Sequence, residues 1–344
     1  MTPTAQHPKA ATAPHRMRVW PSARLLQLSD LPSLNFGEIP LTDEQQALRR
    51  LLNSRIPALC GRMPGPLCDS ALIALQMNLN QGSALHVARF YDKYYVPAWT
   101  VIPYLAANGT VDRERVLDAL GSQAYAMLLH LLDDHLTDGD LPADHLFLQL
   151  RTEAWSEFRA CLGRLGTNIP EADRIAGSLI DRYFAHIHRP PVQHDLAAYE
   201  AVFRGQSATW LIAPLLTATL AGYGPEQRSL LRDMYEEFCL AWRVLDDLRD
   251  CETDAAAGTT TAVYHLLPPS HQPVWQGLAT APEDSDRRQA LLDVLCANGY
   301  PAAARLIRTR LSTAANHAHT LGLDPLAEQY RLLARPLEHL EERP

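Results

Sequence analysis

The chain lacks the features that mark secreted, membrane-spanning and nucleic-acid-binding proteins. Its six cysteines show no CxxC spacing and no paired framework, so reduced thiols in the cytoplasm are expected. No apolar run reaches the length of a membrane span, and the first residues lack the apolar core of a secretory signal. The net charge of −8 leaves no basic stripe to neutralise nucleic-acid phosphates. We therefore expect a cytoplasmic protein with no membrane span and no nucleic-acid partner.

Alternating strand patterns are also missing, and helical periodicity takes their place. Of the 344 residues 47% are hydrophobic, which is enough for a large core. Residues 1–35 are rich in proline and weakly periodic, so we expect them to be disordered, and residues 36–344 to form one all-α domain. Helices are predicted from about residue 43 and over residues 67–80, 83–106, 112–137, 143–164, 171–188, 195–221, 225–255, 285–298, 301–320 and 325–341.

Two aspartate clusters, roughly a hundred residues apart, each end a long apolar helical stretch. Their members are Asp133, Asp134, Asp138, Asp246, Asp250 and Asp254. Residues four apart share a helix face, so Asp246, Asp250 and Asp254 form one acidic stripe, and Asp134 and Asp138 form a second. One such cluster would be read as solvated surface charge. Two clusters whose carboxylates repel within each helix favour a Mg²⁺ site, because Mg²⁺ takes carboxylate oxygens and keeps positions open for phosphate.

Three motifs in order resemble those of trans-isoprenyl diphosphate synthases. Residues 241–250 (AWRVLDDLRD) resemble the second aspartate-rich motif, residues 128–134 (LLHLLDD) the approach to the first, and residues 199–222, with RGQSA at 204–208, the helix between them. The resemblance implies an antiparallel helical bundle of the isoprenoid synthase type around a central apolar cavity, with three Mg²⁺ ions at its mouth. Two ions would be bound by the first cluster and the third by the second, which gives the metal ligands Asp133, Asp134, Asp138, Asp246, Asp250 and Asp254.

The departures from that family concern the second substrate. Chain-elongating members hold isopentenyl diphosphate with a basic stretch, but the similar place here, residues 61–66, keeps only Arg62. Residues 138–142 (DGDLP) are acidic where the family has paired arginines. Gln206 stands where the middle motif of the family has a lysine, and residues 258–261 (GTTT) stand where the family has a later lysine-containing stretch. Burying a second diphosphate without cations is unfavourable, so we expect the isopentenyl diphosphate site to be lost.

Two chemistries of isoprenoid biosynthesis then remain for one allylic diphosphate, whether geranyl, farnesyl or geranylgeranyl diphosphate. The leading hypothesis is a class I terpene synthase, a lyase that cyclises or quenches the carbocation, because the second stripe resembles the metal triad of terpene cyclases. The alternative is a prenyltransferase for another acceptor, since residues 94–99 (YYVPAW) and the general layout resemble the moenomycin-type prenyltransferase. A lipid-binding helical protein with a dead site is disfavoured by the intact aspartates. The oligomeric state stays open, with a homodimer as one option.

The predicted site also contains cations and aromatic rings. Arg204 resembles the diphosphate-sensing arginine of cyclases, and Tyr330 and Arg331 resemble the pairs that close over the diphosphate in those enzymes. A desolvated aromatic ring stabilises a nearby cation by about 2 kcal/mol, although each ring by itself is more often a core residue. The catalytic candidates are Asp133, Asp134, Asp246 and Arg204. The substrate-binding candidates are Arg204, Arg243, Gln206, Ser207, Tyr125, Trp210, Phe238, Trp242, Tyr330 and Arg331.

Overall fold

The computed structural model describes residues 20–78, 87–92, 94–109, 111–139, 141–187 and 193–340, and within these ranges the chain is helical without a strand. The α-helices are α1 (Asp43–Cys60), α2 (Gly65–Asn78), α3 (Pro97–Ala107), α4 (Arg113–Asp138), α5 (His145–Gly166), α6 (Ala172–Ile187), α7 (Leu196–Gln206), α8 (Ile212–Leu220), α9 (Pro225–Arg249), α10 (Cys251–Ala257), α11 (Ala262–Leu266), α12 (Gln272–Thr280), α13 (Ser285–Val294), α14 (Tyr300–Thr320) and α15 (Asp324–Ala334). Shorter helical turns are η1 (Ala23–Leu25), η2 (Leu28–Ser33), η3 (Val87–Asp92), η4 (Ala208–Leu211), η5 (Leu295–Gly299) and η6 (Arg335–Leu340). The predicted all-α fold is confirmed.

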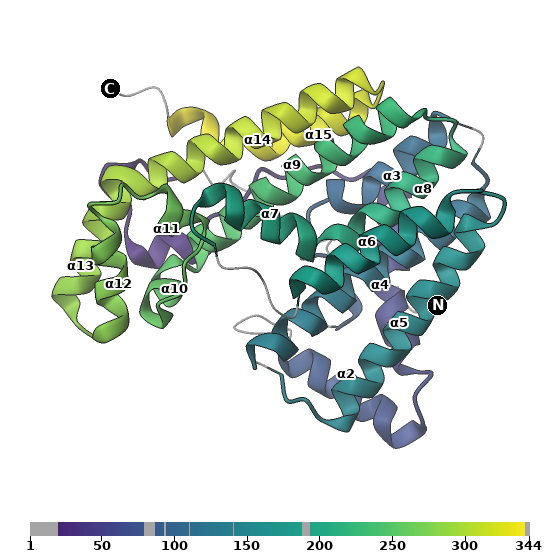
Figure 1. The fold of residues 1–344 in the computed structure, drawn as a ribbon, viewed down its shortest axis with the longest axis horizontal. Helices are drawn as coiled ribbons and strands as arrows, with labels where there is room; N and C mark the ends of the chain where they lie inside the picture. The colour runs from purple at the N-terminus through teal and green to yellow at the C-terminus, as the bar shows by residue number, and fades with distance from the viewer. Residues whose placement is uncertain are drawn as a thin grey trace, which may run out of the picture.

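The helices form a bundle in which the two aspartate-bearing helices, α4 and α9, are both internal. Helix α14 packs along α9 and α15, α4 packs along α5, and α8 contacts both α3 and α4 (Figure 1). Helices α10, α12 and α13 form a smaller group beside the ends of α9 and α14 (Figure 1). The buried apolar side chains belong to one cluster that extends from Trp20 to Leu337.

Helix α4 is central, and its middle is buried on all sides. Every residue from Ala119 to His130 is buried, and most of them are apolar. The helix begins at Asp112, whose side chain accepts a hydrogen bond from the Arg115 N–H. It ends at Gly139, which adopts the left-handed conformation with φ 82°. The first aspartate cluster therefore occupies the last two turns, where the helix emerges from the core.

Three long predicted helices are interrupted. Of the helix predicted over residues 83–106, residues 83–86 and 93 lie outside the described residues and residues 87–92 form η3. The α-helix α3 begins at Pro97, which has no N–H with which to continue an earlier helix but suits a first position. The helix predicted over residues 195–221 divides into α7, η4 and α8, because Pro214 cannot donate to the carbonyl of Trp210. The helix predicted over residues 225–255 divides into α9 and α10 at Asp250.

The N-terminal prediction is corrected for part of the segment. Residues 20–35 were expected to be disordered, but they carry η1 and η2 and bury Trp20 and Leu31. The Trp20 ring stacks on Tyr300 at 5.7 Å, and the Tyr300 hydroxyl donates to the carbonyl of Pro21. A few large, widely spaced apolar side chains thus hold this segment against the core, although its sequence shows no helical periodicity. Residues 1–19 lie outside the described residues.

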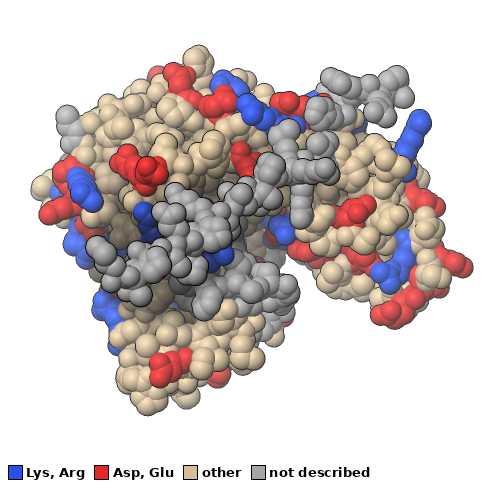
Figure 2. Space-filling model, turned by 180° about the vertical axis from the view of Figure 1, so that it is seen from behind, with Lys and Arg blue, Asp and Glu red and all other residues tan. Residues whose placement is uncertain are grey.

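Figure 2 shows acidic and basic side chains interspersed on the face that it presents, so the described residues of this face form no continuous basic stripe. None of the helices described is both long enough and apolar enough to cross a bilayer.

Candidate functional site

The first aspartate of the α4 cluster is buried and paired. The side chain of Asp133 is 1% exposed, and its Oδ2 accepts a hydrogen bond of 2.6 Å from the Tyr183 hydroxyl on α6. Arg151 on α5 forms an ion pair with both carboxylate oxygens, with Nη2 3.2 Å from Oδ2. Burial and this carboxylate raise the pKa of Tyr183, which keeps the hydroxyl as a donor. Both oxygens of Asp133 therefore have protein partners.

The α9 cluster contains a matching buried aspartate, Asp247. The Tyr199 hydroxyl donates to its Oδ2 at 2.6 Å, and the backbone N–H of Ala262 donates to the same oxygen at 2.9 Å. Nε of Arg243 lies 2.9 Å from Oδ1 and 2.7 Å from the Tyr199 oxygen. In each Asp-Asp pair, one carboxylate is thus fixed by a tyrosine and an arginine, and its neighbour is left more accessible.

The accessible neighbours are Asp134 and Asp246. Asp134 is half-buried, and the side chain of Asp246 is 38% exposed, with its Oδ2 3.7 Å from Nη1 of Arg243. Their charges act on one group between the helices. Burial raises the pKa of the Tyr94 hydroxyl, and both Asp134 and Asp246 raise it further. Tyr94 also packs against Trp242 of α9, with ring centroids 6.0 Å apart, and Trp210 contacts both Trp242 and His130 of α4. The ends of α4 and α9 therefore both lie near Tyr94.

The second acidic stripe continues across the junction of α9 and α10. The N–H of Asp250 donates to the carbonyl of Asp246 at 3.1 Å, and the N–H of Asp254 to that of Asp250 at 2.9 Å. Burial, followed by repulsion from Asp247, Asp250 and Asp246, raises the pKa of Asp254 to about 7. Burial and then Asp246 likewise raise the pKa of Asp250. The stripe is a run of mutually repelling carboxylates, and repulsion of this kind is what a bound cation relieves.

The carboxylates do not form a closed cage in this conformation. Within the described parts of the chain, no three His, Cys, Asp or Glu side chains converge closely enough to hold a metal ion. Asp138 is exposed at the end of α4, one turn after Asp134.

Aromatic rings pack around the accessible aspartates. Trp242, one turn before Asp246, is half-buried and packs against Trp210 with ring centroids 5.2 Å apart. Tyr94 lies 6.0 Å from the Trp242 ring, and Phe203 lies 6.3 Å from it. These rings, from α7, η4, α9 and the segment before α3, form an aromatic cluster directly beside the converging aspartates.

His130 joins the aromatic cluster from α4. Its ring lies 5.0 Å from the Trp210 ring, and its Nδ1 lies 3.1 Å from the carbonyl oxygen of Gln206. Burial lowers the pKa of His130 despite the nearby Asp134. Gln206 therefore contributes its backbone to this contact, and the Ser207 hydroxyl donates to the carbonyl of Phe203.

The two predicted diphosphate-binding arginines have different environments. Arg204 forms ion pairs with Glu236 at 3.3 Å and Glu200 at 3.6 Å, so its charge is already shared. Arg243 lies over the Phe203 ring, with Cζ 5.6 Å from the ring centroid, and is held beside Asp246 by Asp247. The structure thus brings Arg243 to the converging aspartates.

Other predicted residues lie deeper or on the surface. Phe238 and Tyr330 are buried against each other with ring centroids 5.5 Å apart, two turns of α9 below Asp246. Arg331 is exposed and pairs with Glu328 on α15, so the Tyr330 and Arg331 side chains lie in different environments. Tyr125 is buried on α4, where burial raises its pKa and Arg55 opposes the shift.

No sequence motif indicates the residues that fix the buried aspartates. Arg151 and Tyr183 follow Asp133 by 18 and 50 residues and lie on other helices. Their contacts depend on how α5 and α6 pack on α4, which no motif encodes.

Comparison with known proteins places the fold. No protein-family model and no curated protein matches the chain. A geranylgeranyl pyrophosphate synthase of Corynebacterium glutamicum is similar in structure, with 17% identity over 92% of this chain and 98% of that chain and a TM-score of 0.66. So are a geranylgeranyl pyrophosphate synthetase of Pyrococcus horikoshii (15%, 87% and 98%, 0.59) and a polyprenyl synthase of Caulobacter crescentus (16%, 90% and 97%, 0.59). The chain therefore has the all-α isoprenoid synthase fold.

Proposed function

We propose that the protein is a Mg²⁺-dependent enzyme that ionises an allylic prenyl diphosphate. The observation that carries the proposal is that Asp134 and Asp246 lie near Tyr94, at the ends of two helices whose adjacent aspartates are fixed by Tyr–Arg pairs and whose rings His130 and Trp242 both pack against Trp210. The similar C. glutamicum synthase has been solved with isoprenyl diphosphate and magnesium, which supports the same ligand class here.

The donor set fits a hard divalent cation. All the accessible groups are carboxylates, and those of the second stripe raise one another's pKa. Bound Mg²⁺ would supply Lewis-acid charge to the departing diphosphate. Asp133 has both oxygens engaged, so its proposed role is to orient α4. The residues proposed to hold the metal are Asp134, Asp138, Asp246, Asp250 and Asp254.

Two arginines are proposed to bind the diphosphate. Arg243 is fixed between Asp247 and Asp246, so its guanidinium is already oriented beside the proposed metal ligands. Arg204 must exchange Glu236 or Glu200 for a phosphate oxygen before it can contribute fully. Diphosphate binding at Arg204 is therefore coupled to rearrangement between α7 and α9.

The proposed fate of the carbocation is cyclisation or quenching within the active site. Trp242, one turn before Asp246, packs against Trp210 and Phe203, so the proposed cation would form near these rings. A desolvated ring stabilises a cation by about 2 kcal/mol. The aromatic cluster therefore favours a terpene synthase that retains the cation until it rearranges.

The second candidate is a prenyltransferase with an acceptor that carries no diphosphate. Arg62, the one cation left in the segment that resembles the isopentenyl diphosphate site, forms ion pairs with Glu157 and Glu153 of α5. Its charge is thus compensated, and the two carboxylates repel a second diphosphate. The fold supports this candidate too, since the similar proteins named above are all prenyl or polyprenyl diphosphate synthases.

Product analysis separates the two candidates. The protein is incubated with Mg²⁺ and geranyl, farnesyl or geranylgeranyl diphosphate, with and without isopentenyl diphosphate. A terpene synthase releases a hydrocarbon or alcohol of unchanged carbon number from the allylic substrate alone. Products that appear only when an acceptor is added, and that contain both carbon skeletons, establish the transferase. Chain elongation with isopentenyl diphosphate would contradict both candidates.

A further inference from the structure

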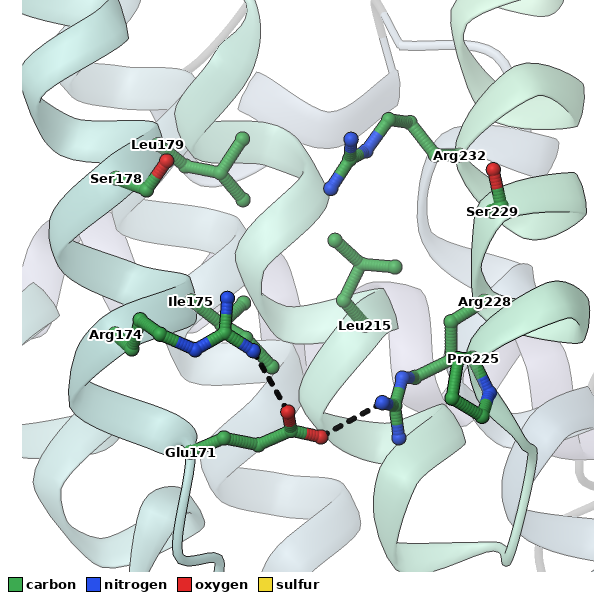
Figure 3. A pocket seen from close by; sticks show the side chains of 10 residues that line it. All are labelled: Glu171, Arg174, Ile175, Ser178, Leu179, Leu215, Pro225, Arg228, Ser229 and Arg232. Carbon is green, nitrogen blue, oxygen red and sulfur yellow. Dashed lines mark hydrogen bonds and ion pairs between the residues drawn. The ribbon is translucent and has the colours of Figure 1, made fainter.

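A second candidate site lies at the opposite end of α9. A cavity of about 200 Å³ opens between α6, the buried Leu215 of α8 and the first two turns of α9 (Figure 3). Its polar lining consists of Glu171, Arg174, Ser178, Arg228, Ser229 and Arg232. Because Arg232 precedes Asp246 by 14 residues on one helix, the two sites are roughly 21 Å apart. The cavity is therefore separate from the converging aspartates.

The cavity carries more positive than negative charge. Its lining contains three arginines and one carboxylate, in a chain whose net charge is −8. Glu171 divides its charge between Arg174 and Arg228, each 2.7 Å away (Figure 3). No carboxylate among the described residues pairs with Arg232, whose guanidinium points into the cavity (Figure 3). The lining thus carries two more positive than negative charges.

Two other features add to the preference for an anion. Pro225 is the first residue of α9, so the positive end of the helix dipole lies at the cavity. The hydroxyls of Ser178 and Ser229 stand on opposite sides of the opening (Figure 3) and can donate to an acceptor oxygen. The floor, by contrast, is apolar and includes Ile175, Leu179 and Leu215.

We propose that this cavity binds the phosphate or diphosphate group of a small organic anion, with its apolar part against the floor. A phosphate group presents several acceptor oxygens and can bind two guanidinium groups at once. The single carboxylate of the lining, Glu171, already pairs with Arg174 and Arg228. Arg232 and Arg228, one turn apart on α9, bind the group from one side, and Ser178 faces it from α6. The proposal is independent of the chemistry assigned to the aspartates.

Calorimetric titration of the full chain in EDTA tests the proposal, since no metal can then recruit phosphate to the aspartates. The probes are inorganic phosphate, inorganic pyrophosphate and n-butyl phosphate. We expect saturable binding of pyrophosphate, and tighter binding of n-butyl phosphate than of inorganic phosphate because of the apolar floor. Equal affinity for the last two would assign the site to free inorganic anions and overturn the organic part of the proposal.

Variants locate the binding. Arg232→Gln, at an exposed position, is expected to weaken pyrophosphate binding roughly tenfold without changing the thermal unfolding temperature. Glu171→Gln is expected to strengthen it, because a competing carboxylate charge is removed. Arg305→Gln, an exposed change of the same charge on α14, is expected to leave the affinity unchanged. No saturable binding, or binding weakened by Arg204→Gln and not by Arg232→Gln, would overturn the proposal.

Discussion

Replacing Asp133 and Asp134 separately with asparagine distinguishes the anchoring aspartate from the proposed metal ligand. Asp133→Asn removes the charge that Arg151 and Tyr183 hold at a position with 1% exposure. Breaking a fully buried ion pair costs about 3–5 kcal/mol, but the Arg151 side chain is 25% exposed and keeps part of its hydration. We therefore expect a loss of about 2 kcal/mol in the free energy of unfolding. Asp134→Asn, which removes a repelling charge at a half-buried position, should stay within about 0.5 kcal/mol.

Equilibrium urea unfolding in EDTA, followed by far-ultraviolet circular dichroism, measures both values. The activities should follow the opposite order. Asp134→Asn should lose Mg²⁺-dependent turnover, and Asp133→Asn, at a temperature where it is folded, should keep a measurable share. The reasoning fails if Asp133→Asn is as stable as the parent protein, or if Asp134→Asn is the destabilised variant.

Three further predictions follow from the site. Trp242→Leu keeps an apolar side chain but removes a ring, so the products should shift toward acyclic or earlier-quenched species. Pyrophosphate release should fall only modestly. An unchanged product profile by gas chromatography would show that the ring only packs against its neighbours. The pKa of Asp254 is raised to about 7, so in metal-free buffer its contribution to the free energy of unfolding falls as the pH rises from about 4 to 7. Asp254→Asn should therefore raise the unfolding temperature at pH 8 more than at pH 5. An equal effect at both pH values would contradict the raised pKa. Arg62→Gln should leave turnover of the allylic substrate unchanged, because Glu157 and Glu153 already hold this arginine; a large loss would show that it binds substrate.

Sequence patterns predicted the elements that are long and apolar. The helix ending at Asp138 was predicted within a residue or two at each end, because a long, mostly apolar stretch lies between the breaks at residues 108–109 and at Gly139. Helices α11 and α12 were not predicted, since five and nine residues are too few to display a period. The break before Pro97 was missed because the flanking segment is apolar on both sides of it.

The candidate site was predictable where it depends on spacing along one helix. Four-residue spacing predicted that Asp246 and Trp242 share a helix face, and the Trp242 ring packs on Trp210, which also contacts His130 of α4. Spacing could not tell which member of each Asp-Asp pair is buried, because that depends on Arg151 and Tyr183 for one pair and on Tyr199 for the other. The compensation of Arg62 by Glu157 was hidden for the same reason, since it depends on the packing of another helix.

The central claim is that the aspartates at the ends of α4 and α9 ionise an allylic diphosphate together with Mg²⁺. Its most direct test is pyrophosphate release from farnesyl, geranyl and geranylgeranyl diphosphate during a Mg²⁺ titration, for the parent protein and for Asp246→Ala. Circular dichroism must show that the variant is folded. We predict release that saturates with Mg²⁺ for at least one substrate and is lost in the variant. Release that is independent of Mg²⁺, or that survives in a folded Asp246→Ala protein, would contradict the account.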